Sequence, residues 1–101
     1  MRLRTEGREF LTRHDYESAI PTYKLLIAEY EKNPRLHTDH NRAIAYYSFG
    51  LAYLKLNNFT EAYPNLKKSV DLDSQCQLYH DKLRQCEAAM SVKNERTYNV
   101  I

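Results

Sequence analysis

The sequence predicts an all-α fold of about five helices, and three observations lead to this prediction. The chain has 101 residues with only two glycines and three prolines, so few positions interrupt a helix. Apolar residues recur at helical spacing over long stretches, and no run alternates apolar and polar residues as a half-buried strand does. Two parts of the chain also repeat one another, which indicates a stack of similar helical units.

The internal repeat becomes visible when the sequence is shifted by 43 residues against itself. Gly7 then aligns with Gly50, so both glycines of the protein are used. The other matching pairs are Leu3 with Tyr46, Phe10 with Tyr53, Asp15 with Asn58, Tyr16 with Phe59, Ala19 with Ala62, Pro21 with Pro64, Tyr23 with Leu66 and Lys24 with Lys67. This number of matches at one offset indicates a tandem repeat of two units.

The two glycines lie inside helical patterns, where glycine costs about 1 kcal/mol relative to alanine. That cost is acceptable where a second helix crosses closely, so Gly7 and Gly50 predict the closest point of a helical hairpin. We expect Ala19 and Ala62 to be the small residues that face them from the second helix of each unit.

The second helix of each unit has a predicted start and a predicted bend. Asp15 and Asn58 precede it and are suited to cap its N-terminus, and Glu61 completes the spacing of a capping box in the second unit. Pro21 and Pro64 follow inside the helix, where proline removes one hydrogen bond. We expect each proline to bend its helix around the neighbouring one.

These signals define a single domain over residues 1–92 and a frayed tail over residues 93–101. Repeat 1 covers about residues 1–36, repeat 2 about 39–73, and a capping helix about 74–92. The individual helices are expected at about 1–13, 16–32, 39–56, 59–72 and 74–92. The last helix has an apolar stripe and a polar far side, which is typical of the helix that closes a solenoid. The stripe consists of Cys76, Tyr79, Leu83, Cys86 and Met90.

The composition argues against several classes of protein. Fifteen basic and thirteen acidic residues give a net charge of +2, which is too small to indicate nucleic-acid binding. No uncharged run approaches the length of a membrane span, and the N-terminal MRLRTEG is not a signal peptide. Cys76 and Cys86 are about 15 Å apart along one helix and cannot bridge each other. We therefore expect free thiols and a reducing compartment, the cytoplasm or alternatively the nucleus.

Few residues suggest catalysis or metal binding. His37 and His40 form an HxxH pattern, but no cysteine or carboxylate cluster completes a metal site, so a structural or solvated role is expected. The sequence also contains no Gly-rich phosphate loop, nucleophile elbow or paired carboxylates. We expect a protein that is not an enzyme and that binds no metal or cofactor.

The repeated spacing, Gly-x2-aromatic followed by Asp/Asn-aromatic-x2-Ala, resembles the tetratricopeptide repeat (TPR), whose basic period is 34. The stretch YYSFGLAYLKLNNFTEAYPNLKKSVDLD carries the pattern well, with Ser74 in place of the usual final proline. The first unit is about nine residues longer than that period. Such extended repeats are similar to those of kinesin light chains, as EAYP at 61–64 and DH at 39–40 suggest, and co-chaperone immunophilins also lengthen their first unit.

The resemblance, which covers about residues 3–90, implies antiparallel hairpins in a short right-handed solenoid whose concave groove binds a protein segment. In a TPR stack the first helix of each unit lines that groove, and here the helix at 39–56 is uncharged from Ala43 through Leu54. The register places these residues in the groove: Arg4, Arg8, Tyr47, Ser48, Leu51, Lys55, Leu78, Lys82 and Gln85. With four cations and no carboxylate, this face predicts an adaptor or scaffold whose partner is an acidic peptide.

Three alternatives remain. A charge-biased face can simply be solvated. The module can instead bind the C-termini of heat-shock chaperones, since Arg4, Arg8, Ser48, Leu78 and Lys82 occupy the positions of the TPR carboxylate clamp. In that clamp, however, both asparagines and one lysine would be replaced here. Finally, the segment can be architectural, stacking on further repeats of a larger chain or forming a homo-oligomer.

Overall fold

The computed structural model describes residues 2–99, and the side chains of residues 2–92. Five α-helices and one 3₁₀ turn make up this part of the chain, without a strand. They are α1 (Arg2–Thr12), α2 (Tyr16–Lys32), η1 (Pro34–Leu36), α3 (Asp39–Lys55), α4 (Phe59–Leu72) and α5 (Gln77–Asn99). The predicted all-α fold with five helices is confirmed. Over residues 2–99, none of these helices has the length and apolar character that crossing a membrane requires.

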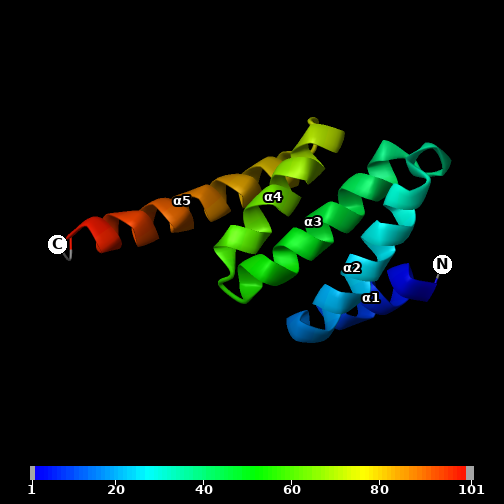
Figure 1. Ribbon diagram of the computed structural model, residues 1–101, viewed down its shortest axis with the longest axis horizontal. Coiled ribbons are helices and arrows are strands. Elements are labelled where there is room, and N and C mark those ends of the chain that lie inside the picture. Colours follow the sequence, from blue (N-terminus) through cyan, green and yellow to red (C-terminus); the bar gives the residue numbers. More distant parts are fainter. Residues whose placement is uncertain (1, 100–101) are drawn as a thin grey trace.

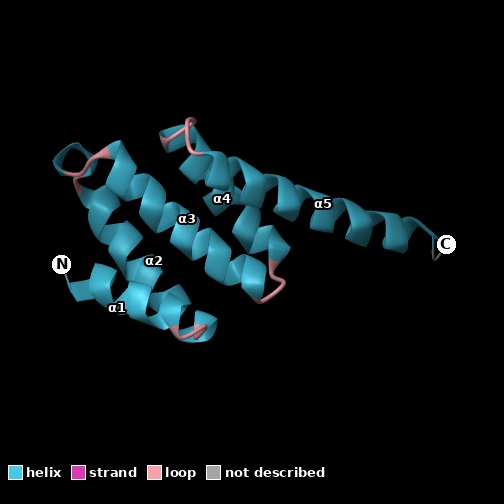
Figure 2. Ribbon diagram, turned by 180° about the vertical axis from the view of Figure 1, so that it is seen from behind, coloured by secondary structure: helices cyan, strands magenta, loops and turns pink. Residues whose placement is uncertain are grey.

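Each helix packs against the next one in sequence and runs antiparallel to it, as Figure 1 shows. Short turns connect the helices (Figure 2). In addition, α1 contacts α3 and α3 contacts α5, whereas α2 and α4 do not contact each other. The odd-numbered helices are therefore closer together than the even-numbered ones, and they form the inner layer of a short helical stack.

The observed helix bounds agree with the predicted ones except in the last helix. The second and fourth helices have the predicted bounds, the third ends one residue earlier than predicted, and the first runs from Arg2, the first described residue, to Thr12 instead of about 1–13. The last helix begins at Gln77 instead of near Ser74, and its backbone continues to Asn99 instead of ending near Val92. Residues 93–99 contain no glycine or proline that would end a helix, which explains the longer element. Residues 100–101 of the predicted tail lie outside the described chain.

The turn inside each unit has the same backbone geometry. His14 and Asn57 both have φ of 60°, the left-handed conformation that ends a helix. The amide of Asp15 then donates to the Phe10 carbonyl at 2.8 Å, and the amide of Asn58 donates to the Tyr53 carbonyl at 2.9 Å. The repeat read from the sequence is thus also a repeat of backbone structure.

The two predicted caps behave differently. The Asp15 carboxylate accepts a hydrogen bond from the Ser18 amide at 3.3 Å, as an N-cap does. The Asn58 side chain makes no capping hydrogen bond. The prediction of a side-chain cap at Asn58 was therefore wrong, although its backbone has nearly the same dihedral angles as Asp15.

Both glycines lie at close helix crossings, but the residues opposite them are not the predicted alanines. A Cβ atom on Gly7 would lie 2.7 Å from Cζ of Tyr23, and one on Gly50 would lie 2.9 Å from Cγ of Leu66. Ala19 and Ala62 are nevertheless fully buried. At each crossing, a large side chain from the second helix therefore packs directly against the backbone of the first helix at its glycine.

The interior consists of two clusters of buried residues. The first joins α1, α2 and α3 around Tyr23, Leu26 and Tyr30. The second joins α3, α4 and α5 around Leu54, Ala62, Leu66 and Cys86, and the predicted stripe residues Leu83 and Met90 pack against it. Tyr79 is also buried. Cys76 departs from the prediction, because it precedes α5 and is only half-buried.

The extra residues of the first unit form the connection to the second unit. They extend α2 to Lys32 and add η1. Across this junction the Arg42 guanidinium binds the Glu31 carboxylate through two nitrogens, at 2.9 and 3.0 Å. The His37 ring packs against Tyr30 with 4.4 Å between ring centroids and 37° between the ring planes, so His37 supports this connection structurally.

Candidate functional site

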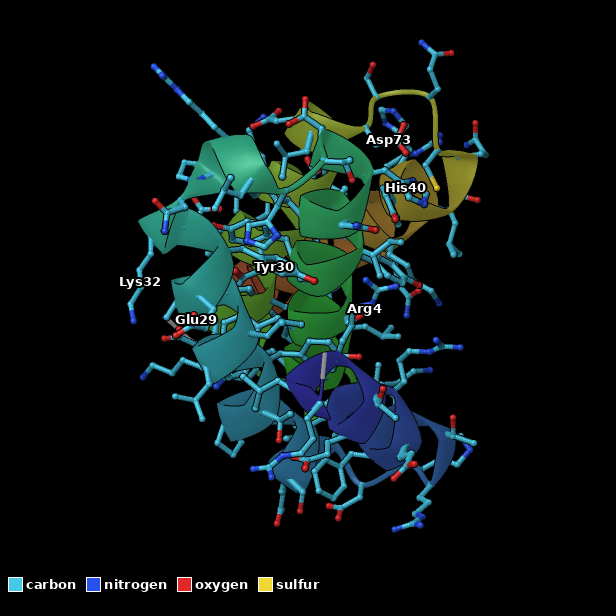
Figure 3. All side chains as sticks on the ribbon, turned by 90° about the vertical axis from the view of Figure 1, so that its right-hand side faces the viewer. Arg4, Glu29, Tyr30, Lys32, His40 and Asp73 are labelled. Carbon is cyan, nitrogen blue, oxygen red and sulfur yellow. The ribbon has the colours of Figure 1, made fainter. Side chains whose placement is uncertain are left out.

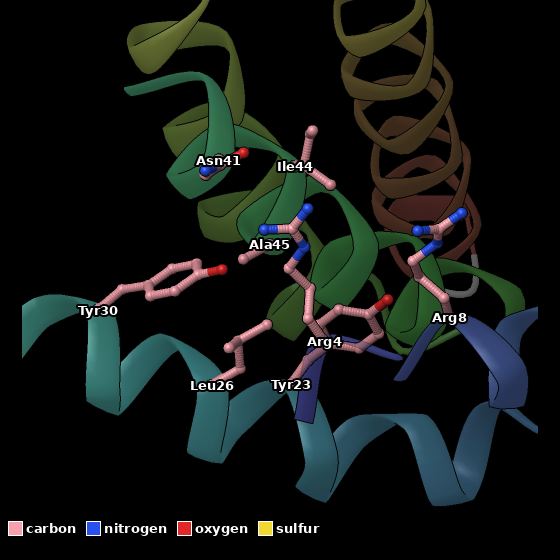
Figure 4. Close-up of a pocket in the computed structure, with 8 residues that line it drawn as sticks. All are labelled: Arg4, Arg8, Tyr23, Leu26, Tyr30, Asn41, Ile44 and Ala45. Carbon is pink, nitrogen blue, oxygen red and sulfur yellow. The ribbon is translucent and has the colours of Figure 1, made fainter. Parts of the chain in front are cut away.

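The inner layer contains two neighbouring hollows. The arginine hollow, with a volume of about 150 Å³, lies between α1, α2 and α3. Its lining residues are Arg4, Arg8, Tyr23, Leu26, Tyr30, Asn41, Ile44 and Ala45. Figure 4 shows the Arg4 guanidinium over the centre of this hollow, with the Tyr30 hydroxyl pointing into it from α2. The lining is thus an apolar floor with polar donors at its edge.

The aromatic hollow, with a volume of about 420 Å³, lies beside the first one and is bounded by α1, α3 and the start of α5. Its lining residues are Arg8, Leu11, Thr12, Tyr23, Ile44, Tyr47, Ser48, Cys76, Leu78 and Tyr79. Most of this surface is apolar. The two hollows share Arg8, Tyr23 and Ile44, so they form one continuous face with a cationic part and an apolar part.

The sequence produces this face through residue spacing on three helices. Arg4 and Arg8 are one turn apart on α1 and therefore project on the same side. Gly7 lies between them and allows α1 to sit directly on the Tyr23 ring. On α3, Tyr47 and Ser48 follow Ile44 by three and four residues, so both lie on the same side of the helix as Ile44.

Arg4 and Arg8 are the unpaired charges of this face. Among residues 2–92, their guanidinium groups form no ion pair or hydrogen bond. The outer side of α2 differs: Figure 3 shows Glu29 and Lys32 projecting away from the stack, and they form an ion pair at 3.1 Å. No aspartate or glutamate of the described residues lines either hollow. The face is therefore positively charged and open to an anion.

Tyr23 lies at the centre of the shared floor, and its side chain is 1% exposed. Burial raises the pKa of Tyr23, while the nearby Ser48 hydroxyl and the Arg8 charge act in the opposite direction. Ser48 affects this pKa as a hydrogen-bonding neighbour would, but in the structure the two hydroxyls do not meet hydrogen-bond geometry, so the Tyr23 hydroxyl has no partner among the described residues. The phenol consequently stays protonated at neutral pH and has an unused donor.

Tyr47 and Tyr79 form the aromatic wall of the second hollow. Their ring centroids are 4.8 Å apart, with an angle of 32° between the ring planes. Burial raises the pKa of Tyr79 to about 12, and the neighbouring Cys76, Asp73 and Tyr47 add to this effect. Burial likewise raises the pKa of Tyr47. Both rings are neutral at physiological pH and present an apolar surface.

The structure brings five of the nine predicted groove residues together along the two hollows. These five are Arg4, Arg8, Tyr47, Ser48 and Leu78. Ser48 is 7% exposed and contributes to the floor, whereas Leu78 is 49% exposed at the rim. Their role in binding stays a prediction.

The other four predicted residues lie elsewhere. Leu51 packs against the second core cluster. Lys55 is exposed in the last turn of α3. Lys82 and Gln85 lie on α5, where the Lys82 ammonium donates to the Gln85 side-chain oxygen at 3.3 Å. None of these four lines the arginine hollow or the aromatic hollow.

Sequence reasoning did not select several residues of this face, among them Tyr23, Asn41, Ile44 and Tyr79. The sequence assigned Tyr23 and Tyr79 to helix packing, but each of them also lines a hollow. One signal was available for Tyr23: the aligned residue of the second unit is Leu66, so only the first unit has a hydroxyl at this position.

The comparisons with known proteins agree with the repeat geometry. Residues 43–76 match the family model described as Tetratricopeptide repeat. This segment covers α3 from Ala43 onward, all of α4 and the turn that follows. A search of curated proteins gave no match to the chain. The segment formed by α3 and α4 is thus a tetratricopeptide repeat, a type of unit that generally mediates protein–protein interaction and is typically not enzymatic.

Within the described residues, no three or more His, Cys, Asp or Glu side chains come together as a metal site would require. His80 directs its ring nitrogen to the Ser74 carbonyl at 2.8 Å. The groups that remain available for recognition are the guanidiniums, hydroxyls and aromatic rings of the two hollows.

Proposed function

We propose that this chain is an adaptor or scaffold module that binds an acidic segment of a partner protein. The observation that carries the proposal is the pair of unpaired guanidiniums, Arg4 and Arg8, next to an apolar hollow whose described lining contains no carboxylate. An extended or helical peptide would place acidic side chains against α1 and apolar side chains between Tyr47 and Leu78. Complementary charge would supply partner selection and fast association.

Peptide arrays of random sequence provide a direct test. The wild-type protein should retain acidic peptides in preference to neutral and basic ones. The double variant Arg4→Glu, Arg8→Glu should lose that preference, because it reverses the charge of the face. The control Lys24→Glu, Arg35→Glu changes net charge equally at exposed positions outside both hollows and should behave as wild type. An acidic preference that survives in the first variant, or none in the wild type, would contradict the proposal.

Binding of heat-shock chaperone C-termini has less support from this geometry. Two of the five clamp positions are occupied by the buried Ser48 and the aliphatic Leu78, and neither offers the directed donors of asparagine. The same arrays can test this function, since peptides with a free C-terminal carboxylate should then be retained better than their amidated forms. The extended repeats of co-chaperone immunophilins and kinesin light chains remain a proposed likeness.

An architectural role is supported by one feature, the length of α5. Its C-terminal part continues beyond α4 and away from the rest of the stack (Figure 1). Val92, on that part, is 49% exposed. Size-exclusion chromatography with light scattering separates the two functions, because a tight dimer favours self-association and a stable monomer favours peptide binding.

In either case we propose a reducing compartment, the cytoplasm or nucleus, for a protein with the free thiols Cys76 and Cys86.

A further inference from the structure

The Tyr23 hydroxyl is an exception to the way buried polar groups are normally accommodated. Nearly all such groups have a hydrogen-bond partner, because an unpaired one has lost its hydration without compensation. Tyr23 is 1% exposed, and its hydroxyl has no partner among the described residues. A donor left in this condition suggests a partner that arrives with a ligand.

The position of this hydroxyl is determined by α1. Gly7 lets the Tyr23 ring lie directly under the helix, where Cζ and the hydroxyl oxygen are 2.7 and 3.1 Å from the position of an added Cβ. In Figure 4 the Tyr23 ring lies between the side chains of Arg4 and Arg8. The hydroxyl is therefore at the boundary of the two hollows, both of which Tyr23 lines.

The second unit indicates that this packing does not require a hydroxyl. Leu66 occupies the aligned position, lies under Gly50 at 2.9 Å, and is fully buried without any polar atom. An apolar side chain can thus fill the space under the glycine. The oxygen of Tyr23 contributes nothing that the helix crossing needs.

We propose that Tyr23, Arg4 and Arg8 form an oxyanion subsite, which receives one carboxylate or phosphate group from a side chain of the bound peptide. This inference rests on the proposed function and specifies its chemistry. The two guanidiniums would bind the oxygens from the open side. The phenol, kept protonated by its burial, would donate from below. Asn41, at the edge of the same hollow, would offer an amide donor.

The neighbouring aromatic hollow extends this inference to a second position of the peptide. It adjoins the subsite through Tyr23 and Ile44, and its surface is mostly apolar. An apolar side chain close to the anionic one would fill it. The recognised motif is therefore an oxyanion-bearing residue next to an apolar residue, rather than acidic character alone.

The test uses short serine–glycine peptides with one leucine next to a single variable residue, which is glutamate, phosphoserine or serine. Wild-type protein should bind the glutamate or the phosphoserine peptide more tightly than the serine peptide in fluorescence anisotropy at low salt. The tighter of the two identifies the oxyanion as carboxylate or phosphate. If the serine peptide binds as well as both, the subsite does not exist.

The variant Tyr23→Phe removes only the hydroxyl. It should weaken binding of the anionic peptide about tenfold, as expected for one hydrogen bond to a charged group, and leave binding of the serine peptide unchanged. The control Tyr63→Phe removes a hydroxyl on α4, outside both hollows, and should change neither. Thermal unfolding of Tyr23→Phe should occur at or above the wild-type temperature, since no internal hydrogen bond is lost.

The outcomes for the two proposals can be distinguished. If Tyr23→Phe binds the anionic peptide as tightly as wild type while Arg4→Glu, Arg8→Glu loses it, the oxyanion subsite is wrong and the acidic groove remains. If Tyr23→Phe weakens the serine peptide equally, the hydroxyl acts on the fold and the subsite is again wrong. If neither variant affects binding, both proposals fail.

Discussion

The two helical units have the same backbone geometry, but their inner helices carry different side chains. Their turns match in the positive φ of His14 and Asn57, and each unit places a large side chain under a glycine. On α1 the inner face carries Arg4 and Arg8, whereas the aligned positions of α3 are Tyr47 and Leu51.

The comparison separates two kinds of positions. The glycines and the turn residues determine how the helices of a unit cross, and they are the same or similar in both units. The positions one turn apart on the inner helix differ between the units: Arg4 and Arg8 are unpaired on α1, whereas Tyr47 and Leu51 pack against the second core cluster. Recognition of a partner would thus use the difference between the units, with charge supplied by α1 and apolar surface by α3.

The largest expected effect concerns the glycine crossing that both units have in common. Gly50→Leu should destabilise the protein by about 3 kcal/mol, at the upper end of typical overpacking costs. The added side chain would meet Leu66 at Cγ and, at 3.1 Å, at its backbone nitrogen, so α4 itself would have to move. Gly7→Leu should cost less, because the nearest atoms there belong to the end of the Tyr23 side chain. Urea denaturation measures both, and an unchanged midpoint for Gly50→Leu would mean that the hairpin register is misassigned.

The second prediction tests the difference between the units, with the glutamate peptide as the ligand. Arg8→Ala should weaken binding about tenfold at low salt and much less at high salt, because exposed charges are screened over about 8 Å at physiological ionic strength. Tyr47→Ala should weaken binding with little salt dependence, since it removes apolar contact. Anisotropy titrations at several salt concentrations provide the measurement.

The control for this prediction is Lys24→Ala, which removes an exposed cation from α2 without touching either hollow. Its binding should equal that of wild type at every salt concentration. The thermal unfolding of Tyr47→Ala should be measured together with its binding, because the Tyr47 ring also packs against Tyr79 and its loss could destabilise the protein. If Arg8→Ala leaves the affinity unchanged at low salt, α1 is not the cationic part of the site.

The sequence was sufficient for most of the fold because the relevant signals are local. The repeat offset and the residues before each second helix placed the starts of α2 and α4 correctly. The end of α5 was not predictable in this way, since residues 93–99 have neither a stop signal nor the apolar periodicity that would require a helix.

The site was less predictable because it depends on which side chains meet across helices. The register correctly assigns Arg4 and Arg8 to one side of α1, but it cannot tell that Tyr23 from α2 reaches between them. Whether a tyrosine hydroxyl finds a partner is decided by distances of a few tenths of an ångström. Likewise, the repeat register places Leu51 on the inner helix, while its packing into the second cluster depends on the position of α4 and α5.

A smaller effect is expected at the two helix starts. Asp15→Ala should destabilise the protein by about 1 kcal/mol, because it removes the hydrogen bond from the Ser18 amide and a negative charge near a helix N-terminus. Asn58→Ala should cost clearly less, since this side chain makes no capping bond. Denaturation midpoints of the two variants give the comparison directly. Equal losses would mean that Asn58 caps α4 in solution.

The smallest effect is expected for the prolines. Pro21 and Pro64 are exposed and occupy the same place in α2 and α4, and both helices continue through them. An alanine would allow one more backbone hydrogen bond, which favours the variant. It would also give the unfolded chain more freedom and remove the expected bend of the helix around its neighbour, which opposes that gain.

These contributions should nearly cancel, so Pro21→Ala and Pro64→Ala are expected to change stability by less than about 1 kcal/mol. Denaturation of both variants under identical conditions measures this. Because the two prolines are aligned in the repeat, their effects should also be similar to each other. A gain well above that value in either variant would show that the packing does not need the bend. A large difference between them would show that the two second helices are held by different forces despite their common backbone.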